Sequence, residues 1–273
     1  MYSYIELIRQ NRMSQDDFFR QAAAEGIKYV EILDQFWKGW SVEEAIDKTL
    51  AMSAETGIKT GCFTINNDFV MEDYAGRKKE IMKTIAAVDT AKKLGAPVIR
   101  VMSGLLKNIY SFEEAKPWIV EGFREAVRAA EDNGVILVLE NSGKQVGRAG
   151  EIGAIIEAVG SDHLQACLDT ANFYGFDEDP VEATKLLGPK IVHVHVKDVV
   201  LDREGWEGYR SKKGRLISGI TLGEGLVDFK NIFCELRKNH YTGLLSIEYE
   251  GRNGDPINNV SRSIAFIAKL NEN

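Results

Sequence analysis

The segment Asn133-Gly134-Val135-Ile136-Leu137-Val138-Leu139-Glu140 contains a helix end, a glycine, an apolar run and a carboxylate, in that order. A glycine just past a helix adopts the left-handed conformation that ends it, and a short continuous apolar run is typical of a buried parallel strand. The same order of helix, glycine and apolar run recurs at Glu25-Gly26-Ile27, Thr56-Gly57-Ile58 and Leu94-Gly95-Ala96. This recurrence predicts a chain of repeated β/α units.

Eight apolar runs are candidate strands, at residues 2–5, 27–33, 58–64, 97–102, 135–140, 164–169, 191–196 and 244–248. Amphipathic stretches such as 75–94 and 113–133 lie between them, and Ser or Asp stands where helix N-caps are expected, at Ser14, Ser41, Ser111, Asp179 and Asp228. We therefore expect an α/β fold, a single (β/α)8 TIM barrel that forms one domain over residues 1–273. The first candidate strand begins beside Met1, which is consistent with a few residues missing before it.

An open doubly wound sheet is the alternative fold. It would carry a glycine-rich dinucleotide loop after the first strand, and no GxGxxG motif stands there. Two connections are long for a compact domain, residues 197–227 and 103–112, and we expect both at the carboxyl face of the barrel. The first of them is expected to be either functional or disordered.

The bulk composition is that of an ordinary soluble protein, with 44% hydrophobic and 27% charged residues. No apolar stretch approaches the roughly 18 residues of a membrane span, and the amino terminus lacks the pattern of a signal peptide, so we expect a cytoplasmic protein. The net charge of −7 argues against a nucleic-acid-binding surface. The three cysteines form no CxxC pair, so we expect all three to be reduced.

Four of the apolar runs end in residue types that bind metals, which are Glu140, Asp169, His195 and Glu248. Packing explains a carboxylate or imidazole at the end of a buried strand poorly, and four on separate strands suggest one shared site. Three oxygen donors and one imidazole suit a divalent cation, with Mn²⁺ expected first and Mg²⁺, Co²⁺ or Zn²⁺ as alternatives.

Several neighbours of these residues have two readings. Strand alternation places His193 on the same face as His195, but only His195 lies at the rim, so His193 is expected to contact substrate or support a ligand. Glu250 is the alternative to Glu248 as a ligand, and Glu31 is either a carboxylate hydrogen-bonded inside the barrel or a site residue. The basic cluster at 210–215 is either a solvated loop or a phosphate clamp, the former being the more common case.

Two residues after the early strands are candidate sugar contacts. Trp37 either stacks on a sugar ring or covers the barrel rim, and Asn66 either forms a turn or binds sugar hydroxyls. We count both among the candidate substrate-binding residues.

The motifs between residues 130 and 250 resemble those of the sugar phosphate isomerase/epimerase superfamily, the xylose isomerase-like TIM barrels. They are Leu139-Glu140-Asn141, Leu168-Asp169-Thr170-Ala171-Asn172-Phe173, His193-Val194-His195-Val196-Lys197-Asp198, Gly223-Glu224-Gly225-Leu226-Val227-Asp228-Phe229 and Ser246-Ile247-Glu248. The resemblance implies the same four metal ligands, and it implies that Glu140 and Glu248 also move the substrate proton.

The chain departs from the sugar 3-epimerases of this superfamily at two positions. Asn172 stands where such enzymes carry a substrate-contacting histidine, and Arg203 does not fall at the spacing of their sugar-binding arginine. Asn172, Lys197 and Arg203 are nevertheless our further candidates for substrate contact.

The resemblance implies a divalent-metal-dependent isomerase or epimerase that acts on a ketose or related sugar through an enediolate. The alternative is a carbon–oxygen lyase of the inosose dehydratase type, because the early chemistry is shared. An abasic-site endonuclease on this barrel would need a histidine-rich three-metal cluster, and the chain has 4 histidines in all. A non-catalytic sugar-binding barrel would not need the four ligands. The expected partners are a small sugar and further copies of the chain in a homo-oligomer, without nucleic acid or membrane.

Overall fold

The computed structural model describes residues 1–37, 39–107, 109–142 and 146–271, and it divides into two compact units. Unit 1 comprises Met1–Leu139 and Glu157–Gln165, and unit 2 comprises Glu140–Ile156 and Ala166–Asn273. The boundary passes through the strands β4 and β5 and the helix α6, whose bounds are given below. In the described part of the chain, no helix is both long enough and apolar enough to cross a membrane.

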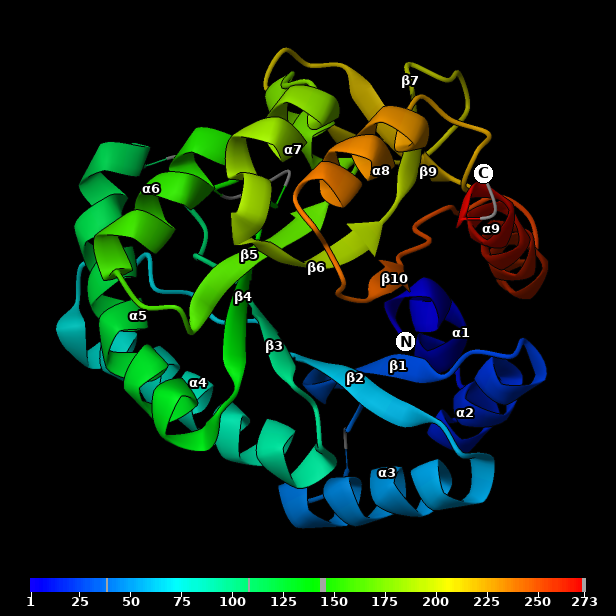
Figure 1. Cartoon of the computed structure of the whole chain (residues 1–273), viewed down its shortest axis with the longest axis horizontal. Coiled ribbons are helices and arrows are strands. Elements are labelled where there is room, and N and C mark those ends of the chain that lie inside the picture. Colours follow the sequence, from blue (N-terminus) through cyan, green and yellow to red (C-terminus); the bar gives the residue numbers. More distant parts are fainter. Residues whose placement is uncertain (38, 108, 143–145, 272–273) are drawn as a thin grey trace. The chain divides into compact units, whose positions relative to one another are not determined.

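Unit 1 contains four parallel strands in the order β1-β2-β3-β4 and the helices that follow them. Its elements in chain order are η1 (Tyr2–Tyr4), α1 (Ile5–Arg9), α2 (Gln15–Ala24), β1 (Tyr29–Leu33), η2 (Asp34–Phe36), α3 (Val42–Thr56), β2 (Lys59–Thr64), α4 (Tyr74–Leu94), β3 (Val98–Val101), α5 (Phe112–Asn133) and β4 (Ile136–Glu140). Helices α3, α4 and α5 lie on the same side of this sheet (Figure 1). The side chains of β3 are buried along its whole length, as expected for a strand covered on both faces.

Unit 2 contains three parallel strands in the order β5-β6-β10 and a separate antiparallel sheet in the order β7-β9-β8. Together with α6, its elements are α6 (Ala149–Val159), β5 (Leu164–Asp169), η3 (Asn172–Phe176), α7 (Pro180–Leu187), η4 (Gly188–Lys190), β6 (Ile191–Val196), β7 (Asp198–Leu201), β8 (Tyr209–Arg210), β9 (Leu216–Ile220), α8 (Phe229–Lys238), β10 (Leu245–Ile247) and α9 (Pro256–Asn271).

The expected strand at residues 2–5 is wrong, because this segment is helical. Tyr2–Tyr4 forms a 3-10 turn that leads directly into the helix Ile5–Arg9. Tyr4 and Leu7 are buried while Glu6 and Arg9 pair on the exposed side, so the apolar positions follow a helical period. The other seven expected strands are present in the described residues, each within two residues of its expected bounds.

All five expected N-caps are confirmed. Ser14, Ser41 and Ser111 form capping boxes with an acidic residue three positions later, and Asp179 and Asp228 accept hydrogen bonds from the first turns of α7 and α8. Helices α3, α4 and α5 end at glycines in the left-handed conformation, as the repeated helix–glycine–strand phrase predicts.

The long connection after β6 is an ordered structure that begins at a buried carboxylate. The side chain of Asp198 accepts hydrogen bonds from the backbone N–H groups of Val199, Gly223, Gly225 and Val227, at 2.9, 2.9, 2.9 and 3.1 Å. One carboxylate therefore ties both ends of the connection together. This leaves β8 and β9 to form the small antiparallel sheet with β7 between these anchored ends.

Candidate metal centre

The four residues expected to bind a metal lie together in unit 2. Glu140 ends β4, Asp169 ends β5, His195 lies on β6, and Glu248 directly follows β10. The parallel register pairs Asp169 with His195, and the backbone N–H of Glu248 donates to the carbonyl of Val196 at 3.0 Å. One ligand atom from each of the four residues lies within 4.8 Å of the others. The site is thus formed where the carboxyl ends of neighbouring strands meet.

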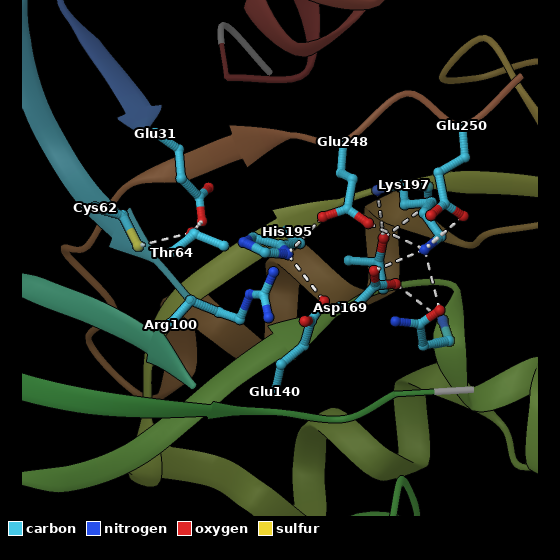
Figure 2. A network of polar contacts seen from close by, with 12 residues as sticks. Glu31, Cys62, Thr64, Arg100, Glu140, Asp169, His195, Lys197, Glu248 and Glu250 are labelled. Carbon is cyan, nitrogen blue, oxygen red and sulfur yellow. Dashed lines mark hydrogen bonds and ion pairs between the residues drawn. The ribbon is translucent and has the colours of Figure 1, made fainter. Parts of the chain in front are cut away.

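Two carboxylates converge on the ring of His195. Its Nδ1 lies 3.0 Å from Oε1 of Glu140 and 2.8 Å from Oε2 of Glu248 (Figure 2). These are ordinary hydrogen-bond distances, so in the metal-free protein the imidazole links the two carboxylates. Three oxygen donors and one imidazole nitrogen within reach of one another also suit a divalent cation.

Asp169 presents only one of its carboxylate oxygens to this centre. Its Oδ1 accepts the backbone N–H groups of Ala171 at 2.8 Å and of Asn172 at 2.9 Å. The buried Oδ2 accepts no hydrogen bond from the described residues, although Nζ of Lys197 lies 3.1 Å away. An oriented but unbonded carboxylate oxygen at full burial is what a cation ligand requires.

Asn141 holds Asp169 in this orientation. Its side-chain Oδ1 accepts the backbone N–H of Asp169 at 2.7 Å, and its Nδ2 donates to the carbonyl of Asp169 at 3.0 Å. Its own carbonyl accepts a hydrogen bond from Nδ2 of Asn172 at 3.0 Å. Both residues therefore join the ends of β4 and β5 below the ligand atoms.

Lys197 places a buried ammonium group beside the four ligands. Its Nζ lies 2.9 Å from Oε2 of Glu250, 3.0 Å from Oδ1 of Asn172, and 3.1 and 3.2 Å from carboxylate oxygens of Asp169 and Glu248 (Figure 2). Burial by itself lowers the pKa of this lysine, but Asp169, Glu250 and Glu248 together raise its pKa well above the ordinary value. The side chain is therefore charged at neutral pH.

The site brings several carboxylates together. Those of Glu140, Asp169, Glu248 and Glu250 lie around the ammonium of Lys197 and the imidazole of His195. In the protein without a metal, burial raises the pKa of Asp169 to about 7, and the neighbouring Glu248 and Glu140 add to the rise. Because buried carboxylates need a countercharge, this set of donors fits a hard divalent cation.

Two further expected site residues belong to the same neighbourhood. His193 is buried on β6, and its ring lies edge-on to that of His195 at 5.3 Å between centroids. Asn172 is buried at the start of η3, where its Oδ1 faces both Lys197 and the hydroxyl of Tyr209, the latter at 3.5 Å. Both therefore lie next to the ligands in space, as expected of residues that contact or support them.

The remaining expected residues have other surroundings. Arg203 is exposed in the loop between β7 and β8, with its guanidinium over the ring of Trp206 at 5.1 Å. In unit 1, Trp37 is buried against Phe63 and lines a cavity of about 540 Å³. Asn66 is exposed and accepts a hydrogen bond from Arg100 at 3.3 Å.

Glu31, the other acidic residue considered, is buried on β1 of the same unit and accepts a hydrogen bond from Thr64 at 2.5 Å (Figure 2). This hydrogen bond agrees with one of the two interpretations offered for Glu31 from the sequence, a carboxylate hydrogen-bonded inside the barrel.

Four residues of this neighbourhood were not singled out as contributors by the sequence. Asn141 directly follows Glu140 and Thr170 directly follows Asp169, so their places in the sequence could have indicated that they lie near the candidate ligands. Thr170 accepts the N–H of Lys197 at 2.9 Å and donates to its carbonyl at 2.7 Å. Asp198 ties the ends of the long connection, and Tyr209 reaches Asn172 from β8, which no sequence spacing indicates. Burial raises the pKa of Tyr209, so its hydroxyl stays protonated at neutral pH.

Curated enzymes that align with most of the chain include two with different reactions. The inosose dehydratase of Clostridium beijerinckii is 25% identical over 263 residues, covering 87% of this chain and 84% of that protein. The 2-oxo-tetronate isomerase of Haemophilus influenzae is 25% identical over 249 residues, covering 86% and 88%. A shorter match, to the 3-oxo-isoapionate decarboxylase of Pectobacterium atrosepticum, is 34% identical but spans only 30% of that protein. The relatives are thus sugar-modifying enzymes with different reactions.

Solved structures with the same fold include an L-ribulose 3-epimerase, with a TM-score of 0.75, 20% identity and coverage of 95% of this chain and 90% of that one. A xylose isomerase-like TIM barrel protein from Mycobacterium smegmatis in complex with magnesium has a TM-score of 0.73 at 17% identity, with coverage of 93% and 87%. The IOLI protein with a bound zinc atom has a TM-score of 0.75 at 18% identity, with coverage of 94% and 92%. At these identities the likeness establishes the fold alone.

The family model described as xylose isomerase-like TIM barrel matches residues 19–270. This match covers nearly the whole chain and confirms the expected α/β barrel fold over the doubly wound alternative. The chain belongs to the xylose isomerase-like TIM barrel family.

Proposed function

We propose that this protein is a divalent-metal-dependent isomerase or epimerase that acts on a ketose or related sugar through an enediolate, with Mn²⁺ as the cofactor. The observation that carries the proposal is the placement of two carboxylate oxygens 2.8 and 3.0 Å from Nδ1 of His195. Together with Asp169, these groups would hold a hard or borderline divalent cation.

The relatives and the donor set support the proposed substrate class. An inosose, an oxo-tetronate and a ribulose, in the names of the similar proteins, are all keto compounds of the polyol type. A divalent cation held by the four residues would take the carbonyl oxygen and the neighbouring hydroxyl of such a compound as further ligands.

A bound divalent cation would polarise the carbonyl and stabilise the negative charge that develops on the two oxygens. Glu140 and Glu248 then supply the acid–base chemistry, because they approach the same imidazole nitrogen from separate strands. One carboxylate removes the proton from the carbon beside the carbonyl, and the other returns a proton to the opposite face or to the adjacent carbon. Such assistance contributes on the order of 10²–10⁴-fold to a rate.

A carbon–oxygen lyase is the second candidate. It is favoured by the inosose dehydratase relative, which aligns with 87% of the chain. The lyase shares the first proton abstraction and differs only in the fate of the intermediate, which would expel a neighbouring hydroxyl. Lys197 has a buried ammonium 3.2 Å from Glu248, beside one of the two carboxylates proposed to move the proton.

The reaction is tested by incubating the Mn²⁺-loaded protein in D₂O with ketoses, keto-inositols and 3-keto-glycosides. NMR then follows solvent deuterium uptake and product together. Epimers, aldose–ketose pairs and dehydrated products identify the three reaction types. Absence of both exchange and product over the whole panel, with metal occupancy confirmed, would contradict the proposal.

The roles of the two carboxylates are tested with Glu140→Gln and Glu248→Gln. With metal occupancy confirmed, we expect one variant to exchange substrate hydrogen with D₂O without forming product. Glu182→Gln, at an exposed ion pair on α7, is the matched control and should react like the wild type. Wild-type turnover in both site variants excludes these residues as acid and base.

We further propose that residues 1–273 form one barrel domain of a cytoplasmic homo-oligomer. The family match to residues 19–270 supports the single domain, and light scattering on the purified protein tests the assembly. His193, Asn172, Lys197, Arg203, Trp37 and Asn66 are the proposed contacts to the sugar.

A further inference from the structure

Lys197 has more oxygen neighbours than it has hydrogens to donate. An ammonium carries three N–H donors. Four oxygens surround it at 2.9–3.2 Å, from Glu250, Asn172, Asp169 and Glu248. At any moment one of these oxygens is therefore without a hydrogen bond from the lysine. The ammonium can shift its bonds among these neighbours without leaving the site.

The four neighbours fall into two pairs with different roles. Oδ2 of Asp169 and Oε1 of Glu248 belong to carboxylates that would bind the cation. The oxygens of Glu250 and Asn172 belong to residues outside the set of four ligands. The lysine thus contacts two of the expected metal ligands and two hydrogen-bond acceptors outside that set.

The competition is sharpest at Asp169. Its Oδ1 is committed to two backbone N–H groups, so Oδ2 is the oxygen that both the lysine and a cation can use. An ammonium 3.1 Å from that oxygen also repels a divalent ion bound to it.

The backbone of Lys197 holds the ammonium in place. Thr170 bonds both its N–H, at 2.9 Å, and its carbonyl, at 2.7 Å. The next residue is Asp198, whose carboxylate accepts four backbone N–H groups. Only rotation of the lysine side chain therefore remains to move the charge between the two pairs of neighbours.

We propose that Lys197 is a built-in counter-cation that competes with the divalent metal for Asp169 and Glu248, and that Glu250 moderates this competition by holding the ammonium to its own side. The inference rests on the proposed metal site and adds a means by which the chain sets its metal affinity. In the metal-free protein the lysine stabilises the carboxylates. In the loaded protein it turns toward Glu250 and Asn172.

The two charged residues should then act on metal affinity in opposite directions. Replacing Lys197 by Met removes a positive charge from beside the cation, so Mn²⁺ should bind at least about tenfold more tightly. Replacing Glu250 by Gln releases the ammonium toward Asp169 and Glu248, so Mn²⁺ should bind at least about threefold more weakly. If Lys197 served only to position ligands, both variants would bind Mn²⁺ more weakly.

The experiment is calorimetric titration of chelator-treated full-length protein with MnCl₂ at one pH, for wild type, K197M, E250Q and the double variant. K197R, which keeps the charge, is the control for K197M and should remain close to wild type. The double variant should bind as tightly as K197M, since Glu250 acts through the lysine. Thermal melts add an independent readout, because metal-free K197M should melt at a lower temperature than wild type and gain more from added Mn²⁺.

Weaker or unchanged Mn²⁺ binding by K197M overturns the inference, as does tighter binding by E250Q. If metal-free K197M does not fold, K197Q, which also removes the charge, takes its place, with tighter Mn²⁺ binding in support and weaker or unchanged binding against. Wild-type protein that binds no divalent metal overturns both this inference and the proposed function. Wild-type binding with the wrong order among the variants overturns only the role of Lys197.

Discussion

Asn141 is the residue whose loss should most directly link stability to the metal centre. Asn141→Ala removes two hydrogen bonds, one to the backbone N–H of Asp169 and one to its carbonyl, at 2.7 and 3.0 Å. Asn141 and Asp169 have no exposed surface, so water does not readily replace the lost amide. The backbone that carries the metal ligand is then left without its partners.

The magnitude follows from the two orphaned groups. A buried backbone donor or acceptor without a partner costs about 1–3 kcal/mol, so the pair predicts a loss of about 2–6 kcal/mol in the free energy of unfolding. A residue that orients a metal ligand from outside typically contributes 10–100-fold to affinity, so Mn²⁺ binding should weaken by about that factor.

Urea denaturation of chelator-treated protein measures the first effect, and calorimetric Mn²⁺ titration measures the second. Asn239→Ala is the matched control, because it removes an amide–carbonyl hydrogen bond of 2.9 Å at the half-buried end of α8. That control should cost about 1 kcal/mol or less and leave Mn²⁺ binding unchanged. A loss in N141A no larger than in N239A, with unchanged Mn²⁺ affinity, refutes the reasoning.

Four further outcomes are expected. Burial raises the pKa of Asp169 to about 7, so below this pH a proton must leave before the cation binds. The Mn²⁺ affinity measured by calorimetry should therefore fall about tenfold per pH unit below 7, and an affinity that does not change with pH contradicts this. Asp169 binds its proton more tightly in the folded protein than in the unfolded chain, where its pKa is the ordinary 3.8. The metal-free protein should therefore lose stability as the pH rises from about 4 to about 7, which urea titrations at several pH values measure. His195→Ala removes the nitrogen shared by two carboxylates and should cost more metal than His193→Ala by elemental analysis, and equal losses would overturn the assignment. In Gly225→Ala the added Cβ would lie 2.2 Å from Oδ1 of Asp198, so thermal melts should show a loss of about 1–3 kcal/mol in the free energy of unfolding. Gly150→Ala is the control, because nothing lies within 4 Å of its added Cβ, and it should show no loss of stability.

Local chemistry explains the parts of the fold that the sequence predicted correctly. A serine followed three residues later by an acidic residue can cap a helix by itself, and the Ser14, Ser41 and Ser111 boxes are present as expected. Buried parallel strands need apolar side chains on both faces, so β4, β5 and β6 read as continuous runs. The predicted strand at residues 2–5 was wrong because four residues are too few to distinguish the period of a strand from that of a helix, which here continues to Arg9.

The grouping of the four candidate ligands was also predictable, because the carboxyl ends of neighbouring parallel strands meet at one rim and each of these residues lies at or next to such an end. Glu140, Asp169, His195 and Glu248 accordingly lie within reach of one cation. That neighbourhood agrees with the sequence, while their metal-binding and catalytic roles stay predictions.

The surroundings of the ligands required the tertiary structure. Lys197 follows β6 and Glu250 lies in the chain after β10, so their contact depends on the register of these two strands and on the path of the chain beyond them. Tyr209 reaches Asn172 only because Asp198 ties down a connection whose length gave no indication of its path. Strand ends can be read from side-chain periodicity because it is a local property. The balance of charge around Lys197 could not be read in this way, because it depends on distances between segments far apart in the chain.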